Sequence, residues 1–281
     1  MKRFEMKNLI IATIVTSMSL LLGLMKQPVF AQEAAEEVIY ADATFENFSK
    51  SYWKFSRFDI EDTEAINNFI KINQCDLYKE YSHNEFEWHG IQNKTQKFLL
   101  ESKEKFPAYY SFTQPISLGD YDFTKKGFKI AKEHELDNVK KMLVASDKEG
   151  KDVCDSRYRI PNYPKTIALE LTRPFTLKHI PIDADYAQEL ISKKMKDFND
   201  LRHNGKTREN FLAARQVYIS AKVKLFAHKQ GDVRLTDGTP GVAAKMLGVL
   251  EKIEVYNDPQ LQHLLYEEEF RRKKRKVKKE L

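Results

Sequence analysis

The stretch that decides the fold class is RQVYISAKVKLFAH, residues 215–228. Apolar and polar residues alternate along it, which is the period of a β-strand with one buried face and one face in water. The apolar positions are Val217, Ile219, Ala221, Val223 and Leu225, and the polar ones are Tyr218, Ser220, Lys222 and Lys224. A second β-rich run occupies 246–256, and the connection 230–241 contains Asp-Gly and Pro-Gly turn pairs. We therefore expect two antiparallel neighbouring strands.

The upstream sequence divides into two periods. Short β-rich runs bounded by Pro, Gly and Asp are found at 109–118, 139–145, 166–171 and 175–182. Before residue 107 the apolar residues instead recur at helical spacing. The first such stripe, Phe45, Phe48, Tyr52 and Phe55, could be a stacking platform for single-stranded nucleic acid or glycans, but its spacing favours a core face.

Capping residues set the expected helix ends. One helix is predicted to start at Asp62 or Thr63, and a longer one to cover about 76–105, where Pro107 ends it. Another should start at Asp183 or Asp185, and a last one has Asp258 as N-cap and Pro259 at its first position. This order predicts an α+β fold: a helical N-terminal third, then a mainly antiparallel β-sheet with one or two further helices.

The N-terminal 31 residues have the pattern of an export signal. Lys2, Arg3 and Lys7 precede the uncharged run 9–25, and Val29 and Ala31 fit a cleavage site after Ala31. The alternative is an uncleaved membrane anchor. We predict a signal peptide at 1–31, a single domain at 32–270 and a tail at 271–281, in a protein exported to the periplasm or secreted.

The positive charge is concentrated at the C-terminus. The chain has 47 Lys plus Arg against 41 Asp plus Glu, a net charge of +6. Eight cations against Glu280 give the tail +7, and because residues 1–31 contribute +3, about −4 remains for 32–270. The tail cations are Arg271, Arg272, Lys273, Lys274, Arg275, Lys276, Lys278 and Lys279.

Two interpretations of this tail remain open. Glu267, Glu268 and Glu269 stand four residues before the first three cations, which would suit helical ion pairs. The later cations would repel one another, so the tail is either plainly solvated or binds an anionic surface. Lipid or lipopolysaccharide head groups are the expected partners ahead of nucleic acid, at about 1 kcal/mol per cation.

The remaining candidate residues are cysteines, histidines and carboxylates. Cys75 and Cys154 are the only cysteines, and in an oxidising compartment they are expected to form a disulfide, with two buried thiols as the alternative. The cluster His83, Glu85, Glu87 and His89 could supply two metal ligands at i, i+4 spacing on a helix. A catalytic metal needs about three protein ligands, so ordinary exposed helix pairs are favoured and no metal or cofactor is expected.

Familiar catalytic motifs are missing from the sequence. It has no Gly-rich phosphate loop, no G-x-S-x-G, no H-E-x-x-H and no C-x-x-C. Ser51 with Lys54, and Ser102 with Lys105, have the S-x-x-K spacing of acyl enzymes, but no S-D-N or K-T-G follows.

Several short segments resemble a known family. They are NQCDLYKEY at 73–81, NEFEW at 84–88, QPISLGDYDF at 114–123 and VYNDP at 255–259. The sequence from about 40 to 266 is similar to a family of exported bacterial proteins classed as a domain of unknown function. The resemblance implies export, one domain and no established activity, and it leaves the signal and the tail outside.

We therefore expect a monomeric, exported envelope protein that acts as a non-enzymatic binding module with its tail against an anionic surface. One alternative is a periplasmic hydrolase whose site, metal-dependent or not, the sequence does not reveal. Another is a secreted factor acting inside a host cell, because Lys273–Lys276 resemble a nuclear import signal.

Overall fold

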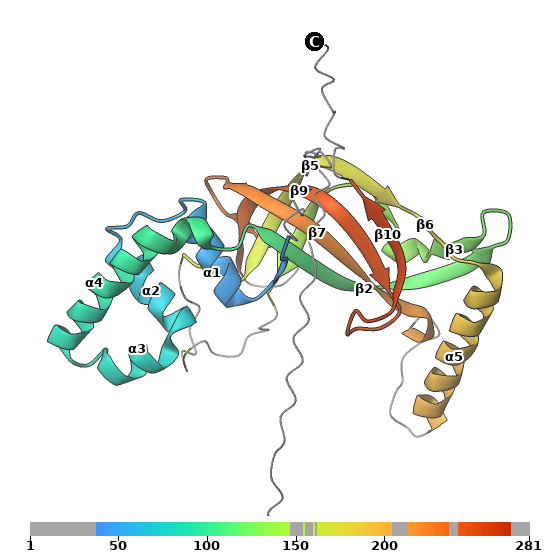
Figure 1. The fold of residues 1–281 in the computed structure, drawn as a ribbon, viewed down its shortest axis with the longest axis horizontal. Coiled ribbons are helices and arrows are strands. Elements are labelled where there is room, and N and C mark those ends of the chain that lie inside the picture. Colours follow the sequence, from blue (N-terminus) through green and yellow to red (C-terminus); the bar gives the residue numbers. More distant parts are fainter. Residues whose placement is uncertain are drawn as a thin grey trace, which may run out of the picture. The chain divides into compact units, whose positions relative to one another are not determined.

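The computed structural model describes residues 38–146, 154, 160, 162–203, 213–235 and 241–270, so the predicted signal peptide and basic tail lie outside the described residues. In the described residues, four α-helices follow the short first strand and precede the other strands of the sheet, and a fifth lies between later strands (Figure 1). They are α1 (Phe45–Lys54), α2 (Thr63–Asn73), α3 (Cys75–Tyr81), α4 (Glu85–Ser102) and α5 (Ala184–His203). Within the described part of the chain, no helix is both long and apolar enough to cross a bilayer.

Among the described residues, ten strands make one mixed sheet, so the expected α+β class is confirmed. They are β1 (Ala41–Asp42), β2 (Tyr109–Asp122), β3 (Gly127–Ile130), β4 (Leu136–Ala145), β5 (Thr166–Leu177), β6 (His179–Pro181), β7 (Gln216–His228), β8 (Val233–Arg234), β9 (Val242–Tyr256) and β10 (Leu264–Glu269). Of the nine strand pairings among the described residues, seven are antiparallel, and β1–β2 and β5–β9 are parallel.

The second helix begins where the sequence predicts, and the first carries the aromatic stripe. The Thr44 side chain accepts a hydrogen bond from Asn47 N and caps α1, and the Asp62 side chain accepts one from Ala65 N and caps α2. Phe45, Phe48 and Tyr52 are fully buried, so this aromatic stripe is a core face, as its spacing favours. Phe55 is only partly buried.

The long helix predicted at 76–105 is in fact two helices. The chain leaves helical geometry after Tyr81, and Asn84 restarts it by accepting hydrogen bonds from Phe86 N and Glu87 N. The two helices contact through the rings of Tyr78 and Trp88, whose centroids lie 5.5 Å apart. An N-cap side chain inside an apolar pattern marks a new helix start, which helical spacing alone does not reveal.

Strands β7 and β9 pair antiparallel along most of their length, as the alternation at 215–228 predicts. The five apolar positions of β7 are all buried, and they face the core with Met246, Leu250, Ile253 and Val255 of β9. Gly248 lies on this face, where an added Cβ would come within 2.8 Å of both Leu169 and Val223. The two long strands therefore form the centre of the sheet.

The sheet curls, and one continuous segment of chain, β5 followed by β6, contributes a strand near each of its two ends. The strand order is β4-β5-β9-β7-β2-β3-β6, and β5 continues into β6 with only Lys178 between them. Ile130 N donates to Lys178 O at 3.0 Å, so the β3 ladder reaches back to this junction. The concave face is filled by side chains of these strands, including Phe128, Leu169 and Phe175.

The last predicted helix is wrong. Asp258 does accept hydrogen bonds from backbone N–H groups, but they are those of Gln262 and His263 in a turn. The chain then forms β10, which pairs with β9. Glu267, Glu268 and Glu269 therefore lie on a strand, and the helical ion pairs expected between them and the first tail cations do not apply.

Candidate functional site: the outer face of the sheet

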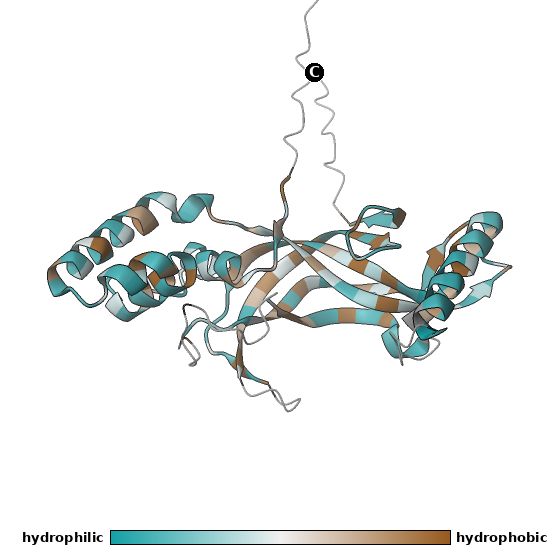
Figure 2. Cartoon of the chain, turned by 90° about the horizontal axis from the view of Figure 1, so that it is seen from below, coloured by the Kyte–Doolittle hydropathy of each residue, from teal (hydrophilic) through white to brown (hydrophobic). Residues whose placement is uncertain are grey.

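The face of β7 and β9 that points away from the core carries the densest set of charged side chains in the described sheet. Hydrophilic and hydrophobic residues alternate along the long strands (Figure 2). A β-bulge in β9 opposite Lys222 and Val223 divides this outer face into two halves. One half holds ion pairs, and the other holds exposed apolar side chains.

We call the first the paired half; it centres on Glu254, which is only 8% exposed. Lys252 Nζ lies 2.8 Å from the Glu254 carboxylate and 2.9 Å from that of Glu267. Tyr256 Oη donates to Glu254 at 2.9 Å, and Lys222 Nζ lies 3.4 Å from it. The full set is Ser111, Ser220, Lys222, Lys252, Glu254, Tyr256 and Glu267.

Hydrogen bonding keeps this network charged. Burial acts to raise the pKa of Glu254, but hydrogen bonds from Lys252 and Tyr256 and the nearby lysine charges outweigh it, so the pKa lies below its usual value. Hydrogen bonds to Glu254 and Glu267 raise the pKa of Lys252. Burial and the bond to Glu254 raise the pKa of Tyr256 to about 12. Each charged side chain of this network has an oppositely charged partner within the sheet, which is typical of a network that stabilises the fold.

The second half lies on the other side of the bulge, where β7 and β9 carry exposed apolar side chains. Phe226 is 44% exposed and Val249 is 38% exposed. Leu247 lies between them, opposite Ala227, and Phe226 occupies a bulge of β7. We call Phe226, Leu247 and Val249 the apolar patch; Leu143, 58% exposed on β4, lies at its margin.

Lysines border this patch on three sides, and we call them the lysine rim. The strand register places Lys224 opposite Val249, Lys141 opposite Glu170, and Lys245 opposite Ala168. Lys229 N donates to Lys245 O, so Lys229 stands beside Lys245. The rim is Lys141, Lys224, Lys229 and Lys245.

Two rim lysines have defined contacts. Lys224 Nζ lies 5.1 Å from the ring centroid of Tyr109, and Lys229 Nζ lies 2.7 Å from the Glu170 carboxylate. The Lys229 hydrogen bond holds the pKa of Glu170 below its usual value. Two carboxylates lie close to the patch: Glu170, and Glu251, which occupies the bulge of β9 and accepts a hydrogen bond from Tyr40 Oη. The four rim lysines outnumber these two carboxylates, so the local charge is positive.

Phe270, the last described residue, is fixed to β9 beside this surface. Phe270 N donates to Glu251 O at 2.8 Å, and the Phe270 ring contacts Phe175 with centroids 6.4 Å apart. The last described residue is therefore attached to β9 at the bulge between the two halves. The tail cations themselves, Arg271 to Lys279, lie outside the described residues.

The four candidate metal ligands, which the sequence favours as ordinary exposed side chains, are not grouped into one site. His83 precedes the N-cap of α4, so its expected helical pairing with Glu87 is wrong. Glu85 and His89 do share α4, but all four side chains are exposed, and Asn84 Nδ2 donates to Glu87 at 3.0 Å. In the ranges that the structure describes, no three His, Cys, Asp or Glu side chains are grouped for a metal ion.

The polar groups between α1 and the sheet have structural partners. Ser51 Oγ donates to Pro107 O and contacts Tyr110 Oη, and Lys54 Nζ donates to Glu104 O, so the first S-x-x-K pair does not face a common point. Arg57 binds the Asp232 carboxylate through two 2.8 Å hydrogen bonds. Its Nη1 also lies 2.9 Å from His228, whose pKa is lowered by burial and by the Arg57 charge.

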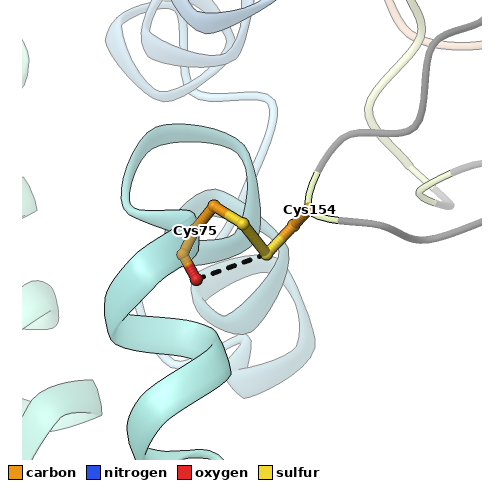
Figure 3. The surroundings of a disulfide bond; sticks show 2 residues. All are labelled: Cys75 and Cys154. Carbon is orange, nitrogen blue, oxygen red and sulfur yellow. Dashed lines mark hydrogen bonds between the residues drawn. A yellow bond between two sulfur atoms is a disulfide. The ribbon is translucent and has the colours of Figure 1, made fainter.

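The predicted disulfide is present (Figure 3). Cys75, the first residue of α3, is bonded to Cys154, and their Cα atoms lie 5.1 Å apart. Cys154 Sγ also lies 3.3 Å from Cys75 O. The bridge ties the helical segment to a point in the chain just before β5, and it lies outside the outer face of β7 and β9.

These features define a mixed α+β domain with a charged outer sheet face. Residues 61–193 match the model of a family described as Domain of unknown function (DUF4852), so the predicted resemblance to a domain of unknown function is confirmed there. The match covers α2 to β6 and half of α5, and it excludes β7, β9 and β10. The comparisons with curated proteins and with solved structures gave no match.

Proposed function

We propose that this chain is an exported envelope protein that works as a binding module, with its basic tail in contact with an anionic surface. The surface chemistry is that of lipid or lipopolysaccharide phosphates. The observation that carries the proposal is the run of eight cations at 271–279, directly after a residue fixed to the sheet. Such a run repels itself in water and is stabilised when a partner supplies negative charge.

The hydrogen bond that fixes Phe270 to the sheet supports the proposal that the tail holds the folded body against a surface. Because Phe270 is bonded to β9, a surface held by the tail is brought up to the folded body. At about 1 kcal/mol per cation near an anionic membrane, eight cations are enough for measurable binding even when several remain in solvent.

A vesicle experiment tests this proposal. The chain beginning at Gln32, after the predicted cleavage site, is compared with a variant in which all eight tail cations are Gln. We expect the parent chain to sediment with phosphatidylglycerol vesicles and not with phosphatidylcholine vesicles, and the variant to bind at least tenfold more weakly to the former. Equal sedimentation of the two proteins would contradict the proposal.

A further inference from the structure

We propose that the apolar patch and the lysine rim form a membrane-docking surface of the folded body, on which Phe226, Leu247 and Val249 enter the interface of an anionic lipid bilayer. This inference rests on the proposed function, because it takes the same anionic surface and names it as a lipid bilayer. It adds a second contact, made by the folded body.

The apolar side chains protrude where the sheet has no need of them. Their strand neighbours Leu225, Gly248 and Leu250 already fill the core face, and alternation directs Phe226 and Val249 to the opposite side. Both are more than a third exposed although they lie on the two central strands. Apolar side chains grouped on a sheet face and bordered by charges are typical of an interaction surface.

The rim supplies charge of the sign that a lipid phosphate requires. Lys141, Lys224, Lys229 and Lys245 border the apolar patch, and they outnumber the nearby carboxylates of Glu170 and Glu251. Long lysine side chains reach the head-group level while apolar neighbours enter the acyl boundary. Apolar centre and cationic border together match an anionic bilayer better than a purely apolar partner.

The residue that precedes the tail, Phe270, is bonded to β9 close to the apolar patch. Glu251, whose carbonyl holds Phe270 N, is two residues beyond Val249 on β9. At about 3.3 Å per strand residue, the point on β9 to which Phe270 is bonded lies about 7 Å along the strand from Val249. Tail and patch can therefore meet the same surface at once, and stable anchoring by a weak apolar contact generally takes such a second, polybasic signal.

The combination separates a bilayer from nucleic acid as the partner. Binding to a polyanion through lysines and arginines alone falls steeply with salt. A contact that also buries apolar side chains keeps a part that high salt does not remove. We therefore expect vesicle binding that weakens but persists in about 1 M salt, where the screening length is about 3 Å.

The direct test places a tryptophan in the patch of the full 32–281 chain. Phe226→Trp is mixed with phosphatidylglycerol vesicles that contain brominated acyl chains, which quench tryptophan only on close approach. The matched control is Phe123→Trp at the β2–β3 turn, where Phe123 is 80% exposed and outside the patch. The unmodified chain supplies the background from Trp53 and Trp88.

We expect quenching for Phe226→Trp and none above background for Phe123→Trp. A second variant, Phe226→Ser with Val249→Ser, should bind about tenfold more weakly in about 1 M salt, and Phe123→Ser should bind as the parent does. Vesicle binding without quenching at position 226 would overturn this inference and leave the proposed function standing. Failure of the parent chain to bind any anionic vesicle would overturn both.

Discussion

The two halves of the outer face are built on the same strands, β7 and β9, yet they use their lysines differently. In the paired half, Lys222 and Lys252 form ion pairs with Glu254 and Glu267. In the other half, Lys224 and Lys245 border exposed apolar side chains. The contrast teaches that one sheet face can combine a stabilising network with a surface suited to a partner, separated by a single β-bulge.

Removal of the disulfide, which lies outside both halves, should have the largest effect on stability. Replacing Cys75 and Cys154 together by Ala should lower the free energy of unfolding by about 3 kcal/mol, because the bridge restricts the unfolded chain. Denaturant unfolding measures this loss. Vesicle binding of the folded variant should match that of the parent. Weaker binding would show that the region around the disulfide also contributes to docking.

Breaking the paired half should have the next largest effect. Glu254→Gln should cost about 2 kcal/mol, because Lys222 and Lys252 lose the charge that both share. Glu269→Gln, on exposed β10, is the matched control and should change stability by less than about 0.5 kcal/mol. If both variants unfold at the same denaturant concentration, the paired half is not a stabilising element.

Low pH should remove the stabilising contribution of the Glu254 carboxylate. The pKa of Glu254 is depressed in the folded state, so its contribution to stability is complete above the ordinary value of 4.5 and is lost as pH falls through the folded pKa. The stability difference between the parent and Glu254→Gln should therefore shrink below about pH 4.5. Unfolding curves at a series of pH values measure it, and a difference that grows in acid would reverse the assigned sign.

The smallest stability effect is expected in the apolar half. Phe226→Ser with Val249→Ser removes side chains that are already about 40% exposed, so stability should change by no more than about 0.5 kcal/mol. A loss as large as that of Glu254→Gln would mean that these side chains are packed for stability, and the distinction between the two halves would fail.

Local sequence signals predicted the elements that depend on near neighbours. The alternation at 215–228 gave β7 and its buried residues, and Asp62 marked the start of α2. The same kind of signal failed at Asp258, because an aspartate that accepts backbone hydrogen bonds caps a turn as readily as a helix. Only the pairing of β10 with β9, which local sequence does not encode, distinguishes the two.

The apolar patch could not be predicted from the sequence, because it too depends on which strands pair. Alternation already places Phe226 on the wet side of β7, but nothing local says that Leu247 and Val249 stand beside it. Ser220 shows the converse, since its polar position predicts exposure and yet it is fully buried against Ser111. Which outward-facing residues are exposed depends on strand register, and register over such distances comes from the whole sheet.

Flotation of the 32–281 chain with phosphatidylglycerol vesicles, at about 0.15 M and about 1 M salt, tests the central claim most directly. We predict binding in both conditions, with the part that survives high salt lost in Phe226→Ser with Val249→Ser. Binding that disappears entirely at high salt, or that the double variant retains in full, would contradict docking through the apolar patch.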